Sequence, residues 1–409
     1  MLRIMSRLAC LIAMLVLAGS ASLTVGGVAA AQGVEVTTLA APDAFTTPGR
    51  DTGLPATLWR GASVKTARTV LPLLAARPLS PAAAALARRL LATGAPGPRG
   101  AGTDAALMGA RASALIAQGD AKAAAAILAR APGIDRNPEL AHAAAESALL
   151  AGDDSRACAV AQGLSSGRDE IYWLRLRAYC QAIGGQTDQA QLTFDLAQAQ
   201  AKDPVFGRLM AAKLAGAGNP GAASLRNGLD YALSHSLGLN LAAAKPSPDV
   251  AAALAGTDPA ASLDTSGIAP DLADLAKAIA TSQPMGSGVF IAAISEIVSG
   301  GPKAAMRGQA AMMLAFLLGD LASIEARDQL GTFTVTEGKA PVGRDLALES
   351  AANQKLMGEA ALLSLWTCAE AGAGGLALGD RIRIVHALHA VGLDADARNF
   401  ALEGLLALK

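Results

Sequence analysis

The chain has 409 residues, and its 34 basic and 34 acidic side chains give a formal net charge of zero at pH 7. Hydrophobic residues make up 52% and charged residues 17%, a balance that excludes wholesale disorder. The balanced charge, with no basic stripe, also argues against nucleic-acid binding, because proteins that bind phosphates carry a basic surface.

Aromatic residues make up only 3% of the chain, so the core must consist of alanine and aliphatic side chains. Alanine has the highest helix propensity, whereas the β-branched and aromatic residues that favour strands are sparse. The composition therefore predicts an all-α fold. The length predicts two or three structural units.

The N-terminus has the three parts of a secretory signal. Residues 1–7 carry two arginines and no acid, residues 8–17 form an apolar run, and Ala29-Ala30-Ala31 precedes Gln32. We therefore expect a signal peptide over residues 1–31 and an exported protein, periplasmic or secreted, without stable membrane insertion. The alternative is that the same apolar stretch is kept as a membrane anchor.

Residues 32–103 are predicted to form an extended leader followed by two helices. The first prolines of this segment lie among Thr, Gly and Ala, which is typical of extended chain. Residues 58–76 have a helical pattern, and a second helix is expected over 81–92, because Ser80 is a good cap and proline fits the first turn. Residues 94–102 contain glycines and prolines and are predicted to be a loop.

A period of 33 residues marks residues 104–235. Four glycines recur with that spacing: Gly119, Gly152, Gly185 and Gly218. Five residues after each glycine there is an alanine, namely Ala124, Ala157, Ala190 and Ala223. Seven residues before each glycine there is another, namely Ala112, Ala145, Ala178 and Ala211. Helix starts recur at Asp104, Asn137, Glu170 and Asp203. Glycine can end a helix in the left-handed conformation, and alanine allows helices to cross closely. The pattern predicts four stacked helical hairpins.

These units resemble the tetratricopeptide family. Gly152-Asp153 followed by Ala157, with Ala145 ahead, is similar to the turn and small-residue positions of that family. The resemblance covers residues 104–235, with a period of 33 instead of 34 and without most of the family's bulky aromatic positions. It implies an α-solenoid in which the first helix of each hairpin lines a groove that binds a protein partner.

Carried over to matching positions, the resemblance implies a set of polar groove residues. They are Glu139, His142, Glu146, Tyr172, Arg175, Tyr179 and Arg208. Within each helix they recur three or four residues apart and so share a face, and tyrosine and arginine are favoured in interfaces. The alternative is that they form an ordinary solvated helix face.

The rest of the chain is predicted to be a linker over residues 236–267 and a C-terminal helical block over residues 268–409. The linker is rich in Pro, Ser, Asp and Gly, with one short helix near residues 249–254. The block has helical patterns over 302–318, 321–329, 346–371 and 380–391. Gly392 with Ala397 repeats the hairpin spacing once.

Export would remove Cys10 and leave three cysteines in an oxidising compartment. Cys158 is expected in the second helix of the second hairpin and Cys180 in the first helix of the third. Those helices are neighbours in a stacked array, so we predict a Cys158–Cys180 disulfide. The alternative is two reduced, buried thiols. Cys368 would be unpaired, buried or linking two chains.

No motif in the sequence indicates catalysis. Gly163–Gly167 matches the G-x-S-x-G pattern but lies between two predicted helices, not between a strand and a helix. His386 and His389 lie one helical turn apart, but no carboxylate lies at a supporting spacing between Arg381 and Val391. Asp380 and Asp394 are outlying possibilities only, so no metal or cofactor is expected. We therefore expect a non-catalytic periplasmic interaction or scaffolding protein with an unidentified protein partner. The alternative is an enzyme, or an accessory subunit of a cell-envelope assembly, with its active region in the C-terminal block.

Overall fold

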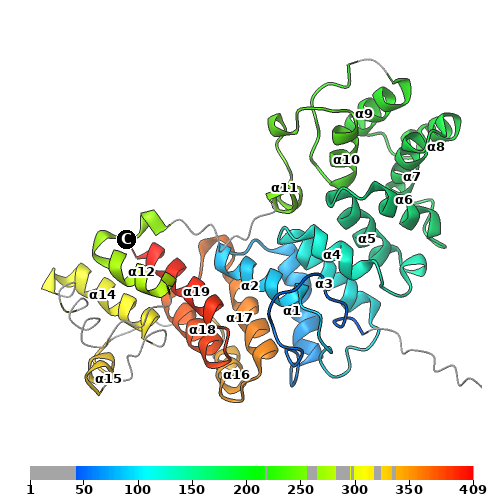
Figure 1. Ribbon diagram of the computed structural model, residues 1–409. Coiled ribbons are helices and arrows are strands. Elements are labelled where there is room, and N and C mark those ends of the chain that lie inside the picture. Colours follow the sequence, from blue (N-terminus) through cyan, green and yellow to red (C-terminus); the bar gives the residue numbers. More distant parts are fainter. Residues whose placement is uncertain are drawn as a thin grey trace, which may run out of the picture. The chain divides into compact units, whose positions relative to one another are not determined.

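All the regular structure in the described part of the chain is helical. The computed structural model describes residues 43–216, 219–255, 265–281, 299–316, 324–333 and 338–408, together with residue 295. These residues contain eighteen α-helices and no strand, which confirms the predicted all-α fold (Figure 1). The predicted signal peptide and the first part of the leader lie outside the described residues. None of the described helices has the length and apolarity needed to cross a bilayer.

Two helices precede the repeats, as the sequence predicts. They are α1 (Val64–Ala76) and α2 (Pro81–Ala92). Helix α1 begins six residues later than expected, because the preceding residues form turns and Ser63 caps the helix by accepting the Thr66 N–H. Trp59 in those turns is nonetheless buried. The segment before α1 is therefore part of the core.

The first three repeat units each form a helical hairpin. The six helices are α3 (Ala105–Ala117), α4 (Ala121–Leu128), α5 (Pro138–Leu150), α6 (Asp154–Gly163), α7 (Ile171–Ile183) and α8 (Thr187–Gln200). Helix α4 contacts α5, and α6 contacts α7, so successive hairpins pack against each other. The side chains of Asp104 and Asn137 cap α3 and α5 by accepting the N–H groups of Leu107 and Leu140.

The turn inside each hairpin has one geometry. Gly152 is in the left-handed region with a φ of 79°, its N–H donates to the Leu149 carbonyl, and the Asp153 N–H donates to the Ala148 carbonyl. The same two bonds and a positive φ occur at Gly119 and Gly185. This is the Schellman arrangement, which satisfies the last carbonyls of the first helix.

The alanines that share the 33-residue period are the closest-packed positions of the hairpins. Ala124, Ala157 and Ala190, five residues after the glycines, have no exposed surface, and neither have Ala112, Ala145 and Ala178, seven residues before. A larger side chain at such a position would separate the helices. In the first three units these alanines are buried, as a position at a helix crossing requires.

The fourth unit differs from the prediction. Helix α9 (Pro204–Ala215) ends at Gly216, and the second helix, α10 (Gly228–Ser236), begins only after a loop. Ala223, expected at a helix crossing, lies in that loop, and Ala211 is exposed. The expected turn residue Gly218 lies outside the described residues. Pro220 interrupts helix formation, and the loop is held by Arg208, which donates to the carbonyls of Pro220 and Ala222.

The described part of the predicted linker contains the short helix expected near residues 249–254. This helix is α11 (Pro248–Ala255), which contacts α3 and α5. Val250 of α11 is buried in a small cluster with Leu150 and Leu225. Residues 41–409 form one compact unit.

The C-terminal block is helical throughout its described part. Its α-helices are α12 (Ala273–Thr281), α14 (Pro302–Ala315), α15 (Ile324–Leu330), α16 (Val342–Asn353), α17 (Met357–Ala371), α18 (Leu378–Ala390) and α19 (Asp394–Ala407). Short 3-10 turns occur along the whole described chain. They are η1 (Ile134–Arg136), η2 (Leu241–Ala243), η3 (Thr265–Gly267), η4 (Pro270–Leu272) and η5 (Gly372–Gly374). The stretch 346–371, expected as one helix, is instead broken into α16 and α17.

That break is a further hairpin turn of the same kind. Lys355 has a φ of 55°, its N–H donates to the Ala352 carbonyl, and the Leu356 N–H donates to the Ala351 carbonyl. Gly392 makes the equivalent turn between α18 and α19. Five residues after these turns, Ala360 and Ala397 again have no exposed surface. Five hairpins in the described residues therefore share one turn and one buried alanine.

The C-terminal hairpins pack on the N-terminal helices. Helix α17 contacts α1, and α2 contacts both α17 and α19, while α1 also contacts α3 (Figure 1). The Gly358 N–H donates to the Leu58 carbonyl at 3.0 Å, and a Cβ at 358 would lie 2.7 Å from that oxygen. Glu359 accepts from the Ser63 N–H and the Thr66 hydroxyl, both at 2.8 Å. Helices α1 and α2 thus join the two sets of hairpins.

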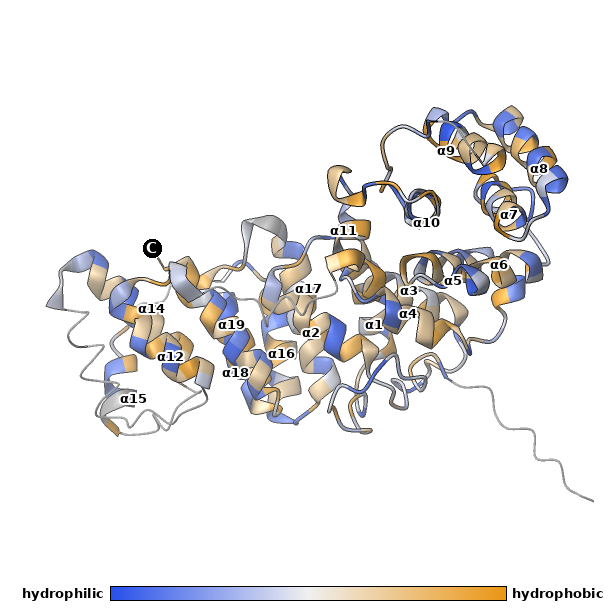
Figure 2. Ribbon diagram, turned by 45° about the horizontal axis from the view of Figure 1, so that its top comes forward, coloured by the Kyte–Doolittle hydropathy of each residue, from blue (hydrophilic) through white to orange (hydrophobic). Residues whose placement is uncertain are grey.

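Most apolar side chains of the hairpins face the core, but helix α8 carries exposed ones. Helix α8 shows hydrophilic and hydrophobic residues together on its surface (Figure 2), and Leu192 and Leu196 are 72% and 55% exposed. They lie four residues apart and so form a small apolar strip on one side of the helix.

The shared turn predicts opposite effects of two substitutions. Left-handed backbone costs a non-glycine residue roughly 1–2 kcal/mol, so Gly152→Ala should lower the free energy of unfolding by about 1 kcal/mol, and Lys355→Gly should raise it by a similar amount. No atom lies within 4 Å of a Cβ added at Gly152, so the first effect comes from the backbone alone. Chemical denaturation measures both, and the same sign for the two variants would contradict the shared geometry.

The buried alanines predict a packing penalty. Ala178→Leu should destabilise the protein by roughly 1–3 kcal/mol, because extra methylenes overpack a close helix crossing. Ala199 in α8 is exposed, and Ala199→Leu is the matched control, expected to change stability by less than about 0.5 kcal/mol. Equal thermal unfolding curves for the two variants would show that Ala178 does not lie at a packed crossing.

Candidate functional site

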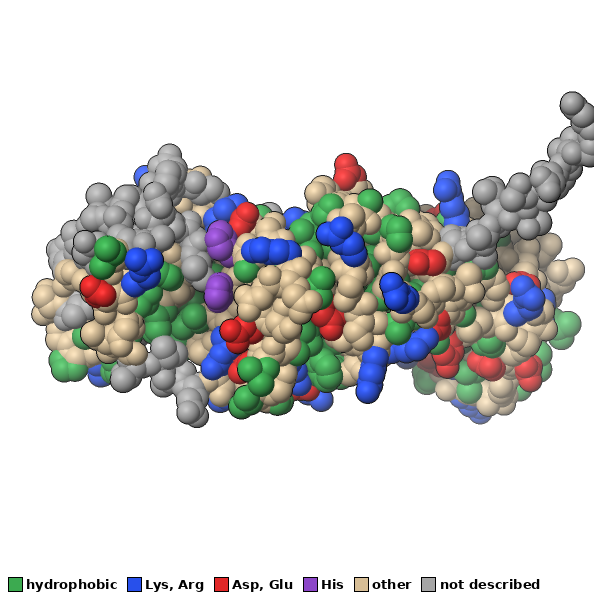
Figure 3. Space-filling model, turned by 90° about the horizontal axis from the view of Figure 1, so that it is seen from below, with side chains coloured by type: hydrophobic (Ala, Val, Ile, Leu, Met, Phe, Trp, Pro, Cys, Tyr) green, Lys and Arg blue, Asp and Glu red, His purple; other side chains and the backbone are tan. Residues whose placement is uncertain are grey.

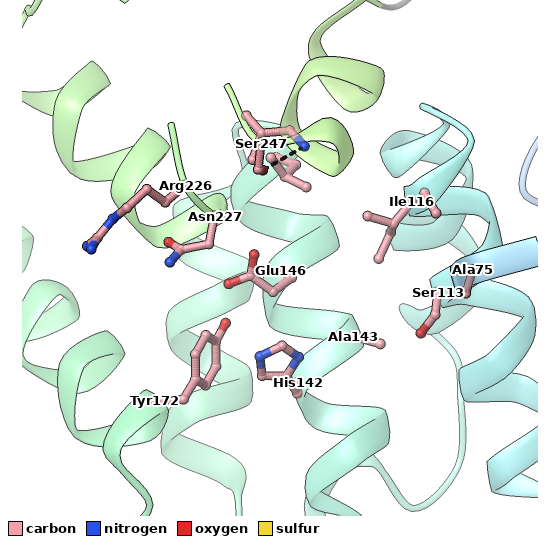
Figure 4. A pocket seen from close by; sticks show the side chains of 13 residues that line it. Ala75, Ser113, Ile116, His142, Ala143, Glu146, Tyr172, Arg226, Asn227 and Ser247 are labelled. Atoms are coloured by element: carbon pink, nitrogen blue, oxygen red, sulfur yellow. Dashed lines mark hydrogen bonds between the residues drawn. The ribbon is translucent and has the colours of Figure 1, made fainter. Parts of the chain in front are cut away.

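A cavity of about 340 Å³ opens between the first helices of the three hairpins and the segment that follows α9. Thirteen residues line it: Ala75, Ser113, Ile116, Ala117, His142, Ala143, Glu146, Leu150, Tyr172, Arg226, Asn227, Ser247 and Val250. They come from α1, α3, α5, α7 and α11 and from the loops before α10 and α11 (Figure 4). His142, Glu146 and Tyr172 are three of the seven residues predicted to line a groove.

Glu146 has one carboxylate oxygen engaged and one unpaired. Its Oε2 accepts the Gly228 N–H at 2.7 Å, at the start of α10, where backbone N–H groups have no partner within the helix. A Cβ at residue 228 would lie 2.6 Å from that oxygen, which explains the glycine. Oε1 is buried and has no hydrogen-bond partner among the described residues. Oε2 therefore stabilises the start of α10, and Oε1 faces the cavity.

Tyr172 presents a second unpaired polar atom. Its hydroxyl points toward Glu146 in Figure 4, but it is buried without a hydrogen bond of acceptable geometry to any described residue. Burial raises the pKa of Tyr172 well above its ordinary value, and the neighbouring Glu146 carboxylate raises that pKa further. The phenol consequently stays protonated at neutral pH and can both donate and accept a hydrogen bond.

Aromatic rings form one wall of the cavity. The His142 and Tyr172 ring centroids are 4.1 Å apart, and Trp173 lies edge-on to Tyr172 with centroids 4.9 Å apart. Trp173 is buried, whereas His142 is exposed and therefore lies where the cavity meets solvent. The buried Trp173 fixes the orientation of the Tyr172 ring.

The opposite wall comes from a segment that the sequence did not indicate. Asn227 caps α10 by accepting the Asp230 N–H at 2.8 Å. Arg226 donates to Asp230 at 2.5 Å and to Asp203 at 2.9 Å, and its guanidinium points away from Glu146 in Figure 4. These hydrogen bonds, the one to Asp230 most strongly, raise the pKa of Arg226 above its ordinary value. From the sequence, Asn227 could have been identified as a helix cap, because it precedes a short helix, but nothing indicated that it lines this cavity.

Three of the other predicted groove residues do not reach the cavity. Arg175 donates to the Ala201 carbonyl at 3.1 Å, lies 3.4 Å from Asp203, and its guanidinium lies over the Phe206 ring. Arg208 holds the loop after α9, as described above, and Glu139 is exposed on α5 without lining the cavity. Arg175 therefore contacts the start of the fourth unit, whereas Arg208 makes its contacts within that unit.

The prediction for Tyr179 is wrong, because its side chain has no exposed surface. Its hydroxyl donates to Asp154 Oδ2 at 2.9 Å and so braces α7 against α6. Burial and the adjacent carboxylate of Asp154 raise the pKa of Tyr179. Helical spacing placed Tyr179 on the face of Tyr172, but seven residues along α7 that face is covered.

The predicted disulfide is confirmed. Cys158 of α6 and Cys180 of α7 are bonded, with Cα atoms 5.5 Å apart. The bond links the second helix of one hairpin to the first helix of the next, as neighbouring hairpins require. Cys368 is a free thiol buried in α17, and burial raises its pKa. A buried thiol of raised pKa has little thiolate character and is inert.

The two motifs that resemble catalytic sites are structural. The Ser165 N–H and hydroxyl both donate to the Asp135 carbonyl at 2.7 Å, so the serine closes a turn between units. His389 Nδ1 lies 2.6 Å from Asp394 Oδ1 across the α18–α19 turn. The pKa of His386 is lowered, mainly by burial. Within the described ranges no three potential ligands are grouped to hold a metal ion.

A second cavity of about 350 Å³ lies between α16 and α18 in the C-terminal block. Its charged groups are largely paired with each other, since Arg383 lies 3.3 Å from Asp345 and 3.5 Å from Asp380. Val342 and Leu346 at its edge are 73% and 61% exposed. Acidic and basic side chains are interspersed on the face shown in Figure 3.

The disulfide predicts a dependence of stability on oxidation. Replacing Cys158 and Cys180 together by alanine should lower the free energy of unfolding by about 3 kcal/mol, because the bond closes a 22-residue separation. Cys368→Ala is the control and should leave the effect of reductant unchanged. Thermal unfolding with and without reductant measures the difference, and equal curves for the wild-type chain would contradict a stabilising bond.

Comparison of the chain with protein-family models, with curated proteins and with solved structures found no match.

Proposed function

We propose that the chain is an exported, non-catalytic interaction protein of tetratricopeptide-like architecture that binds a protein partner at the cavity between α3, α5 and α7. The observation that carries the proposal is that Glu146 Oε1 and the Tyr172 hydroxyl are buried at one cavity and that neither makes a well-formed hydrogen bond to a described residue. Buried polar groups are almost always hydrogen-bonded, and an exception at a cavity indicates a missing partner.

The chemistry of these groups favours binding over catalysis. One oxygen of Glu146 is held by the Gly228 N–H, and Tyr172 keeps its proton because its pKa is raised. A general acid or base needs a pKa near the working pH and freedom to exchange its proton. A phenol that keeps its proton and a carboxylate oxygen that is held in place by a backbone N–H are suited to recognising a ligand.

The size of the cavity favours one anchoring side chain from a larger partner. At about 340 Å³ it lies at the lower end of the roughly 300–1,000 Å³ range for ligand pockets. His142 and Asn227 at its rim are exposed, so a chain lying on the surface can insert a side chain. Interfaces commonly concentrate their binding energy in such an anchor.

Export is supported by the disulfide and by the sequence of the N-terminus. Disulfides persist in oxidising compartments, and Cys158–Cys180 joins two repeats close to the cavity wall formed by α7. Oxidation at this place stabilises the helices that position Tyr172.

A site-specific photocrosslinker tests the proposal in cells of the native host. A photoreactive amino acid at Ser113, which lines the cavity, should give a defined crosslinked protein, identified by mass spectrometry. The control is the same amino acid at Lys65, an exposed residue of α1 about 15 Å along that helix from Ala75. Identical crosslinks at both positions, or none at Ser113 in folded protein, would refute a partner at the cavity.

A further inference from the structure

We propose that this cavity recognises a positively charged side chain, the ammonium of lysine or the guanidinium of arginine, through Glu146, Tyr172 and His142. The inference rests on the proposed function and specifies what the partner inserts. Its starting point is the carboxylate oxygen Oε1 of Glu146, which is buried without a partner. A buried carboxylate oxygen is costly to leave unpaired, so the cavity has a strong preference for a donor.

The distribution of charge around the cavity favours a cation over a neutral donor. Besides the histidine, the charged residues that line it are Glu146 and Arg226. The guanidinium of Arg226 is bonded to both Asp203 and Asp230, so the protein does not use it to compensate Glu146. The start of α10 contributes partial positive charge, but its N–H at Gly228 contacts only the other oxygen. A ligand with a formal positive charge would complete the pairing.

The aromatic wall adds a second attraction for a cation. The rings of His142 and Tyr172 pack with centroids 4.1 Å apart and border the cavity beside Glu146 (Figure 4). The face of a tyrosine ring attracts ammonium and guanidinium groups. The Tyr172 hydroxyl points toward the Glu146 carboxylate, and its oxygen can accept one of the ligand's N–H groups.

The remaining wall is apolar and suits the stem of a long side chain. Ile116, Ala143, Leu150 and Val250 also line the cavity. Lysine and arginine bury their methylene groups along such surfaces while the charged head reaches a polar group. A cation on an aliphatic stem therefore matches both parts of the cavity.

Binding of small cations to the full chain tests this inference by isothermal titration calorimetry. The probes are N-acetylated arginine amide and lysine amide, and the neutral isosteres are the corresponding citrulline and norleucine amides. The cations should bind at least about tenfold more tightly than their neutral isosteres, as expected for a hydrogen bond to a charged group. Equal affinities, or no binding of the cations by folded wild-type protein at millimolar concentration, would overturn the inference.

Three variants locate the effect. Glu146→Gln keeps an oxygen for the Gly228 N–H but removes the charge, and it should abolish the preference for the cations. Tyr172→Phe keeps the ring and should weaken cation binding by roughly threefold to tenfold. Glu139→Gln removes the same charge from an exposed position of the same helix and should leave binding unchanged. Equal losses for Glu139→Gln and Glu146→Gln would show a general charge effect and overturn the assignment.

Two further probes distinguish the source of the cation. Agmatine offers a free guanidinium, whereas a blocked glycine-arginine-glycine tripeptide offers it on a polypeptide. Tighter binding of the tripeptide supports a side chain of a partner, and equal binding supports a free organic cation. In both outcomes, binding of the cation depends on Glu146.

The crosslinking experiment separates failure of this inference from failure of the proposed function. If Glu146→Gln protein still captures the same partner through Ser113 with undiminished yield, cation recognition is wrong and partner binding stands. If cations bind through Glu146 but Ser113 captures no partner, the cavity takes a free cation and the proposed partner is wrong. Circular dichroism and the intact Cys158–Cys180 bond confirm that each variant is folded.

Discussion

The fold depends on one local constraint, a left-handed residue followed five positions later by an alanine with no room for a larger side chain. The left-handed residue ends one helix and starts the next, and the alanine lets the two helices lie close together. Gly152 with Ala157 and Lys355 with Ala360 show the constraint in both halves of the chain. Because each hairpin has this geometry, its open faces are apolar and must be covered by a neighbour.

Covering those faces creates the cavity as a consequence. Helices α3, α5 and α7, which are the first helices of three successive hairpins, lie on its sides. The irregular fourth unit folds back, so that the N–H at the start of α10 bonds to Glu146 and α11 contacts α3. The departure from the repeat at residues 219–227 is therefore what encloses the candidate site, and it leaves Glu146 Oε1 and Tyr172 facing it.

The parts of this arrangement that follow from local sequence could be predicted, and those that depend on distant packing could not. Periodic glycine and alanine determine the first three hairpins, and adjacency of those hairpins brings Cys158 to Cys180. The turn at Lys355 was missed, since lysine gives no signal for a left-handed backbone. Helical spacing found His142, Glu146 and Tyr172 but could not show that Tyr179 is covered by α6. Nothing local indicates that α10 returns to α5.

The N-terminal helices and the C-terminal hairpins form one packed body. The Gly358 amide reports on it directly, because an amide in the first turn of α17 has no intrahelical acceptor and its partner is the Leu58 carbonyl. Residue-resolved hydrogen exchange should find this amide protected like those in the middle of α17. Ala395, at the same position of α19, is exposed and should exchange rapidly. Equally rapid exchange at both positions would contradict the packing of α17 against the N-terminal segment.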